Sequence, residues 1–194
     1  MSDALRILLV DQNTNRASVL EEGLREAGYD DVVMVRDVRN LLRRIVDINP
    51  DVIFIDLENP HRDVLEQMFQ VSRSVPRPIA MFVDHSDTAT IERAVDAGVA
   101  TYIVDGLRKE RIKPILDTTI SRFNAFKRLR DELDQARQAL EERKLIDRAK
   151  GSLMNERRLS EADAYEWLRK TAMNESRRMV DVANSVLRNI KRGK

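Results

Sequence analysis

Aspartates follow four short apolar runs in the first 105 residues of the chain. They are Asp11, Asp56, Asp84 and Asp105. Each run has the length and composition of a buried strand, and the carboxyl ends of parallel strands meet at one edge of a sheet. We therefore expect the four carboxylates to face one crevice. In such sheets, chemistry gathers at this edge.

Basic side chains are the second group that could do chemistry, and they gather in the other half of the chain. Residues 107–194 hold 23 Lys and Arg against 14 Asp and Glu, a net charge of +9. Residues 1–106 hold 11 against 19, a net charge of −8. An acidic half joined to a basic half indicates one module that faces a polyanion. The alternative is that the basic residues only solvate the outer faces of helices.

The aspartates need a sheet to position them, and the hydrophobic pattern predicts one. Five short apolar runs alternate with segments whose apolar residues are three and four positions apart, so strands and helices alternate. This pattern predicts an α/β doubly wound, receiver-like (flavodoxin-like) domain, which we place at residues 1–122. The expected strands lie at residues 6–10, 32–35, 52–55, 79–83 and 101–104.

One strand and its following loop carry a family resemblance. The run at residues 53–60, IFIDLENP, resembles the phospho-acceptor strand and loop of response-regulator receiver domains. The resemblance covers residues 5–122. It implies that Asp56 is the phospho-acceptor and that Asp11 helps to hold Mg²⁺.

Three departures from that family pattern change the expected chemistry. Gln12 replaces the second acidic residue after the first strand, Val83 replaces a hydroxyl residue, and Asp105-Gly106 replaces Lys-Pro. The pocket therefore lacks one carboxylate ligand, one hydroxyl donor and the cation that pairs with a phosphoryl group.

We therefore expect a pseudo-receiver that takes no cofactor, Mg²⁺ included, and that is not switched by phosphorylation of Asp56. Asp11 and Asp56 are its only metal-ligand candidates. Alternatively, both are ordinary strand-end carboxylates that accept hydrogen bonds from backbone N–H groups.

A long helix is predicted next, because residues 115–154 contain no cluster of Ser, Gly or Pro. Residues at a seven-residue spacing favour a coiled-coil-like connecting helix at 123–145 and a parallel homodimer. A monomer whose helix packs against the C-terminal helices is the alternative. The heptad positions are Ile112, Thr119, Phe126, Leu133 and Leu140.

Residues 146–194 are predicted to form a small all-α module of three helices. We expect a loop at residues 155–158, followed by a helix that Ser160 caps with Asp163 at its third position. The residues assigned to packing are Ala149, Leu153, Met154, Ala172 and Met173.

Three stretches of this module resemble the ANTAR domain. They are IDRAKGSLM at 146–154, LSEADAY at 159–165 with Leu168-Arg169, and Ala172-Met173 with DVA at 181–183. The resemblance implies binding to hairpins in nascent leader mRNA, which prevents formation of a terminator. Together with Asp105-Gly106 and the run at 56–60, the chain further resembles NasT-type regulators of nitrate assimilation. In that group a nitrate-sensing partner protein sequesters the antiterminator.

RNA loops are held by phosphate contacts from Lys and Arg and by readout of splayed bases. Tyr165 could stack on a base, whereas the spacing of Trp167 places it in the core. Gly151 either allows close approach of a backbone or ends the long helix. The expected RNA-binding residues are Arg148, Lys150, Gly151, Arg157, Arg158, Tyr165, Arg169, Lys170, Arg177 and Arg178.

Composition argues against enzymes and membrane proteins. The chain has no cysteine, its two histidines (His61 and His85) lack a metal-ligand spacing, and it has no phosphate-binding glycine motif. No apolar stretch approaches the roughly 20 residues that span a bilayer, and the first residues do not form a leader. We therefore expect a cytoplasmic, non-enzymatic protein.

The favoured function is transcription antitermination through leader mRNA, under the control of a sensor partner. One alternative is a DNA-binding response regulator that depends on phosphorylation of Asp56. The other is an adaptor that contacts only proteins.

Overall fold

The computed structural model describes residues 5–105 and 108–192. The chain divides into two compact units, residues 1–127 and residues 128–194, and each is described by itself. Gly106, where the sequence changes from acidic to basic, lies outside the described residues. None of the described helices combines the length and the apolar character needed to cross a membrane.

Unit 1 is built on a parallel sheet with the strand order β2-β1-β3-β4-β5. This confirms the doubly wound, receiver-like fold. The strands are β1 (Ile7–Asp11), β2 (Val32–Val35), β3 (Val52–Leu57), β4 (Ile79–Val83) and β5 (Thr101–Val104). The central strands β1, β3 and β4 are buried along their whole length, as expected for a sheet covered on both faces.

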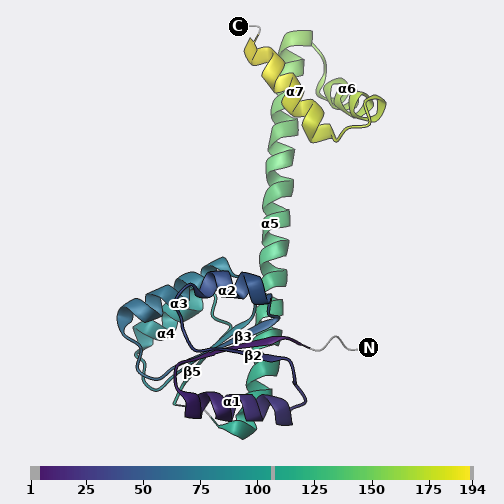
Figure 1. The fold of residues 1–194 in the computed structure, drawn as a ribbon. Coiled ribbons are helices and arrows are strands. Elements are labelled where there is room, and N and C mark those ends of the chain that lie inside the picture. The colour runs from purple at the N-terminus through teal and green to yellow at the C-terminus, as the bar shows by residue number, and fades with distance from the viewer. Residues whose placement is uncertain (1–4, 106–107, 193–194) are drawn as a thin grey trace. The chain divides into compact units, whose positions relative to one another are not determined.

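Helices cover both faces of the sheet (Figure 1). On one face lie α2 (Leu41–Ile48), α3 (Arg62–Ser74) and α4 (Thr88–Asp96), which contribute Leu41, Phe69 and Ala94 to one core cluster. The other face is covered by α1 (Thr14–Glu26) and the first turns of α5 (Ile112–Arg157). Since successive residues of a strand point to opposite faces, each strand contributes to both clusters.

The helix α1 is held in place at its start and along its inner face. Asn13 caps it, because the Asn13 side chain accepts hydrogen bonds from the backbone N–H groups of Asn15 and Arg16. Along the inner face, a Cβ at Gly23 would collide with the side chain of Ile112, so the glycine permits close packing of α1 on α5. These contacts fix the first turn of α1 beside the carboxyl ends of β1 and β3.

Unit 2 consists of the second part of α5, α6 (Glu161–Asn174) and α7 (Met179–Arg192). This confirms the predicted three helices. Ser160 caps α6 as expected, since its Oγ accepts a hydrogen bond from the backbone N–H of Asp163 at 3.1 Å. The core contains Ala149, Leu153, Leu168, Ala172 and Ala183.

Three details of unit 2 differ from the sequence-based expectations. The helix α5 runs through Asn155 to Arg157, so the loop predicted at 155–158 was wrong and Gly151 does not end the helix. The turn begins at Arg158, directly after the end of α5, and the φ of Arg158 is 54°, in the left-handed region. Met154 and Met173, assigned to packing, are exposed because they point away from the seam between the helices.

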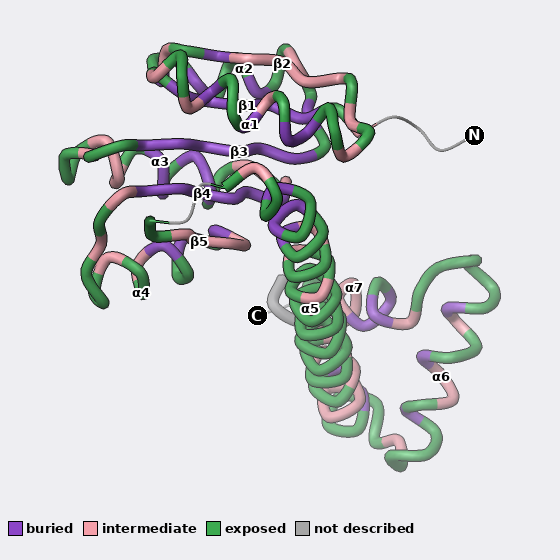
Figure 2. Tube along the Cα trace, turned by 90° about the horizontal axis from the view of Figure 1, so that it is seen from below, coloured by how far each residue is buried: buried purple, intermediate pink, exposed green. Residues whose placement is uncertain are grey.

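The heptad positions of α5 have two different environments. Ile112 and Thr119 are fully buried within unit 1. Phe126, Leu133 and Leu140 are exposed, and every residue from 127 to 141 is exposed as well (Figure 2). The described part of the chain therefore leaves about half or more of each of these three residues exposed, and the homodimer stays a prediction.

Candidate nucleic-acid interface

Unit 1 places three of the four strand-end aspartates around one arginine, Arg16 of α1. Its Nε and Nη2 donate hydrogen bonds to the two carboxylate oxygens of Asp56, each at 2.8 Å. Its Nη1 donates to Oδ1 of Asp84 at 2.5 Å. The Asp56 side chain has no exposed surface, whereas that of Arg16 is 21% exposed. We call Asp11, Asp56 and Asp84 with Arg16 the acidic pocket.

Asp11 lies next to Asp56 in the register of β1 and β3 and is nearly fully buried. Its Oδ1 accepts a hydrogen bond from the backbone N–H of Asn13 at 2.7 Å, but its Oδ2 has no partner among the described residues. Burial raises the pKa of Asp11 to about 6, and the neighbouring Asp56 adds to that rise. The carboxyl of Asp11 is thus poorly compensated at neutral pH.

The arginine and Asp56 influence each other in the same pocket. Burial raises the pKa of Asp56, and the hydrogen bonds from Arg16 offset part of that rise. Burial lowers the pKa of Arg16, but its hydrogen bonds to Asp56 and Asp84 outweigh this and raise it. Arg16 therefore stays protonated at every pH at which the protein is folded.

The fourth aspartate of the expected crevice is placed differently. Asp105 is exposed at the end of β5 with a φ of 47°, and no described hydrogen bond or ion pair links it to the other three. Val83 is buried at the end of β4 and Gln12 is exposed. Arg16 was not among the site residues predicted from the sequence. Its only signal was its position five residues after Asp11, beside the buried Ala17.

In unit 2, most of the basic residues expected to bind RNA already have partners within the module. Lys150 pairs with Asp147 and Glu161, both at 2.8 Å. The Arg157 guanidinium lies 4.6 Å from the centre of the Trp167 ring. The other partnered residues are Arg169 and Lys170 with Glu166, Arg177 with Glu175, and Arg178 with Glu142.

Two of these ion pairs link helices, and the other ion pairs lie within one helix or one turn. The Lys150–Glu161 pair joins α5 to α6, and the Arg178–Glu142 pair joins the start of α7 to α5. Exposed pairs of this kind each contribute less than about 1 kcal/mol and can exchange for phosphate contacts. Tyr165 is exposed on α6, and Trp167 packs against the core of unit 2, as their spacing predicted.

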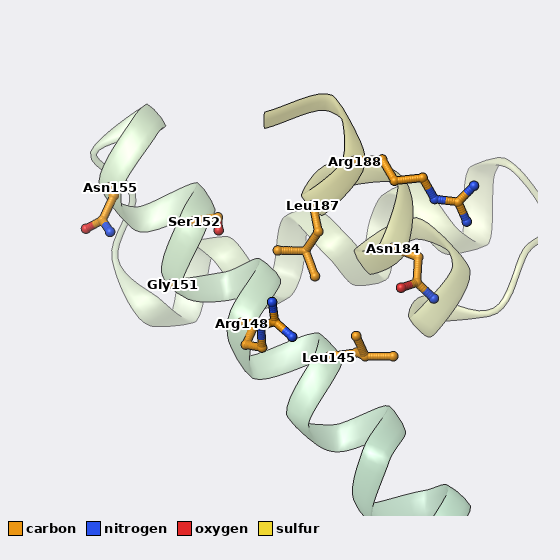
Figure 3. A pocket seen from close by; sticks show the side chains of 8 residues that line it. All are labelled: Leu145, Arg148, Gly151, Ser152, Asn155, Asn184, Leu187 and Arg188. Atoms are coloured by element: carbon orange, nitrogen blue, oxygen red, sulfur yellow. The ribbon is translucent and has the colours of Figure 1, made fainter. Parts of the chain in front are cut away.

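A groove lies between α5 and α7 in unit 2 (Figure 3). Its volume is about 580 Å³, within the range of small-molecule pockets. Figure 3 shows the side chains of Arg148 and Leu187 facing each other across it. The residues that line it are Leu145, Arg148, Gly151, Ser152, Asn155, Asn184, Leu187 and Arg188.

The lining has the chemistry that RNA recognition requires. Among the described residues, neither Arg148 nor Arg188 forms a salt bridge, so both guanidiniums are available to phosphates. Asn155 and Asn184 offer amide donors and acceptors that suit base edges. A Cβ at Gly151 would meet nothing within 4 Å, so this glycine leaves open space in the groove wall.

The groove is lined both by residues that were predicted from the sequence and by residues that were not. Arg148 and Gly151 were predicted from the ANTAR-like stretch, whereas Asn155, Asn184 and Arg188 were not. The last two lie on α7, about 30 to 40 residues from Arg148 along the chain. The recurrence of polar side chains four residues apart, at Asn184 and Arg188, was the only signal that could have found them.

Comparisons with known proteins match two separate parts of the chain to two protein families. Residues 7–117 match the response regulator receiver domain, and residues 134–187 match the ANTAR domain. The transcriptional regulatory protein PdtaR of Mycobacterium tuberculosis is 30% identical over 182 residues, which cover 94% of this chain and 89% of PdtaR. A nitrate regulatory protein of Klebsiella oxytoca is 37% identical over 88 residues, which cover 45% of this chain and 22% of that protein.

Solved structures with a similar fold support the receiver-like fold of unit 1. The signal receiver domain of a modulated diguanylate cyclase from Desulfovibrio desulfuricans has a TM-score of 0.54 and 19% identity. The match covers 63% of this chain and 98% of that one. A CheY-like receiver domain protein from Methanospirillum hungatei also has a TM-score of 0.54, with 17% identity, over 63% of this chain and 99% of that one.

Proposed function

Since this chain belongs to the ANTAR-containing response regulators of the PdtaR type, we propose that it is an RNA-binding transcription antiterminator that acts in the cytoplasm and is not an enzyme. ANTAR domains are RNA-binding domains, and residues 134–187 match that family. Binding to hairpins in a leader transcript would keep a terminator from forming.

The groove between α5 and α7 is the observation that carries this proposal. Along residues 134–187 and the next residue, it brings together two asparagines, an open glycine and two arginines that form no salt bridge with the described residues. Phosphate contacts supply affinity for RNA, and amide groups beside them can read the edges of unstacked bases. The other predicted RNA-binding residues, the basic ones and Tyr165, do not line the groove and would supply further contacts.

We also propose that the chain controls genes of nitrate and nitrite assimilation and that a nitrate-sensing partner protein sequesters it. The partial similarity to a nitrate regulatory protein supports the first part. The second part is supported by Gln12, Val83 and Asp105, which replace the acid, hydroxyl and lysine of phosphorylated receivers. The sensor would act through contact with the protein.

A parallel homodimer through α5 belongs to the same proposal. Phe126, Leu133 and Leu140 recur every seven residues and are exposed on one chain, so a second α5 could cover them. Two RNA-binding modules on one dimer would suit a leader with two hairpins, because linked modules bind with a raised effective concentration.

A salt-titrated binding assay tests the RNA proposal. The full chain is measured against a two-hairpin leader RNA and against duplex DNA of equal length. We expect tighter binding to the RNA than to the DNA. The slope of the logarithm of the binding constant against the logarithm of the salt concentration should decrease in magnitude by about 1 to 2 in the variant with Arg148→Ala and Arg188→Ala. The matched control is Arg43→Ala with Arg44→Ala, which removes two exposed charges from α2 of unit 1.

The outcomes separate the candidate functions. Equal and steeply salt-dependent affinity for both nucleic acids would argue against specific antitermination. Tighter binding to the DNA duplex would favour a DNA-binding response regulator, and no binding to either would leave a protein adaptor.

A further inference from the structure

We propose that Arg16 is the resident cation of the acidic pocket, held where a receiver domain would hold its divalent metal and phosphoryl group. This deepens the regulatory part of the proposed function, which rests on control without phosphorylation. The receiver-like unit would then be insensitive both to Mg²⁺ and to phosphoryl donors.

The fit of Mg²⁺ to the pocket is poor. Gln12 is exposed and carries no charge, and both carboxylate oxygens of Asp56 are already engaged by Arg16 at 2.8 Å. Within residues 5–105 and 108–192, no group of three or more carboxylate or imidazole side chains is arranged to hold a metal ion. A hard cation that needs several free oxygens would have to displace the guanidinium first.

The charges of the pocket explain why a cation is needed there. Asp56 is fully buried, Asp11 is nearly so, and Asp84 is partly buried, so three carboxylates crowd a poorly hydrated space. Isolated buried carboxylates are strongly disfavoured, and opposite charge is the usual remedy. The family's lysine position holds Asp105, which leaves Arg16 as the cation that pairs with the pocket.

The geometry of Arg16 suits a permanent counter-ion. A guanidinium presents its N–H donors in a rigid fork, so two parallel bonds to Asp56 leave a third edge for Asp84. Asn13 caps the helix three residues earlier, which places Arg16 in the first turn, next to the carboxyl ends of the strands. Arg16 thereby ties the end of β3 to the end of β4.

Phosphorylation would meet the same obstacle. A phosphoryl donor must be attacked by a free lone pair on an Asp56 oxygen, with cations around the transferred group. Both oxygens accept charge-assisted hydrogen bonds, and the side chain has no exposed surface. The attacking oxygen of Asp56 would have to give up its hydrogen bond to Arg16 and become accessible before it could react.

A gain of metal binding tests the proposal. The full chain is compared with Arg16→Met, which keeps an unbranched side chain about as long as the aliphatic stem of arginine and removes the charged guanidinium. The control is Arg25→Met on the same helix, since Arg25 forms only an exposed pair with Glu21. Thermal unfolding is followed in EDTA and in millimolar MgCl₂ or MnCl₂, and Mn²⁺ affinity is measured by titration calorimetry.

We expect no metal-dependent rise of the unfolding midpoint for the wild type or for Arg25→Met. We expect a clear rise for Arg16→Met, with Mn²⁺ affinity at least about tenfold above that of the wild type, because a ligand that binds only the folded state stabilises it. A purely structural role for Arg16 would lower stability without creating metal affinity.

Three results would overturn the proposal. They are metal-dependent stabilisation of the wild type, modification of wild-type Asp56 by acetyl phosphate seen in mass spectrometry, and a folded Arg16→Met variant that gains no metal affinity. If Arg16→Met does not fold, two measurements on the wild type still test the proposal: metal-dependent stabilisation and modification of Asp56 by acetyl phosphate. RNA binding is measured on the same wild-type preparation, so a failure of the RNA proposal is seen separately.

Discussion

The guanidinium of Arg16 and the carboxylate of Asp56 form two parallel hydrogen bonds of 2.8 Å across the edge of the receiver-like sheet. This pairing engages both oxygens of the residue that would accept a phosphoryl group in a receiver domain. It also connects the stability of unit 1 to the charges of three aspartates. The predictions below begin there.

Replacing Arg16 should destabilise unit 1. Arg16→Met leaves the buried Asp56 without its counter-ion, and we expect the free energy of unfolding at neutral pH to fall by about 3 kcal/mol. Adding Asp56→Asn should recover part of the loss, because the uncompensated charge is removed. Urea denaturation in EDTA measures both variants. Arg25→Met, which breaks an exposed pair, should cost less than about 1 kcal/mol; a similar loss from both arginines would contradict the prediction.

The pH dependence of stability should show the titration of Asp11. Its folded pKa of about 6 lies above the value of 3.8 for an unperturbed carboxyl, so the folded state binds the proton more tightly than the unfolded state between these values. The free energy of unfolding contributed by this group therefore falls as the pH rises from about 4 to 6, by about 2 to 3 kcal/mol.

Asp11→Asn isolates that contribution, because the other titrating groups are common to both proteins. The variant should gain stability relative to the wild type as the pH is raised, and the difference should level off above the folded pKa. Urea denaturation at several pH values gives the difference directly. A constant difference across this range would show that Asp11 does not titrate as described.

Gly151→Ala should separate stability from RNA binding. Gly151 lies inside α5 with open space where a Cβ would be, so alanine should stabilise the helix by about 0.5 to 1 kcal/mol. If an RNA backbone approaches the groove wall closely, the same methyl group should weaken binding to leader RNA. Chemical denaturation and RNA titration of the variant measure the two effects, and unchanged RNA affinity would remove Gly151 from the interface.

Asn184→Ala should alter which RNA loops are bound. The amide of Asn184 lines the groove and offers hydrogen bonds to a base edge, so its loss should weaken the preferred loop by about 1 to 3 kcal/mol while the salt slope stays the same. Binding to a series of loop variants measures this. Arg188→Ala provides the contrast, with a lower slope and similar losses for every loop.

The exposed heptad residues should govern the oligomeric state. Replacing Phe126, Leu133 and Leu140 together by serine should convert a dimer into a monomer, because the apolar seam of α5 is removed. Sedimentation velocity of the full chain measures the mass. A control that replaces Arg128, Glu132 and Gln135 by serine changes exposed residues off the seam and should leave the mass unchanged.

The order of elements, the parallel sheet and the three-helix module were determined by the sequence itself. Apolar runs of four or five residues ending in Asp11 or Asp56 require a buried parallel strand, and the Ser160–Asp163 cap marks the start of a helix, because both signals are local. The end of α5 was missed: its last turn runs to Arg157, whose guanidinium lies over the ring of Trp167, ten residues further on.

The two sites depended on the tertiary structure. Arg16 and Asp56 are 40 residues apart, and Arg148 and Arg188 are also 40 residues apart, so no local pattern indicates that either pair meets. Only the tertiary structure shows that Arg16 neutralises the aspartates. It also shows that Arg148 and Arg188, beside the groove, form no salt bridge with the described residues. The partner of a charged side chain is decided by the tertiary structure, because Coulomb energy and desolvation depend on distance and burial in three dimensions.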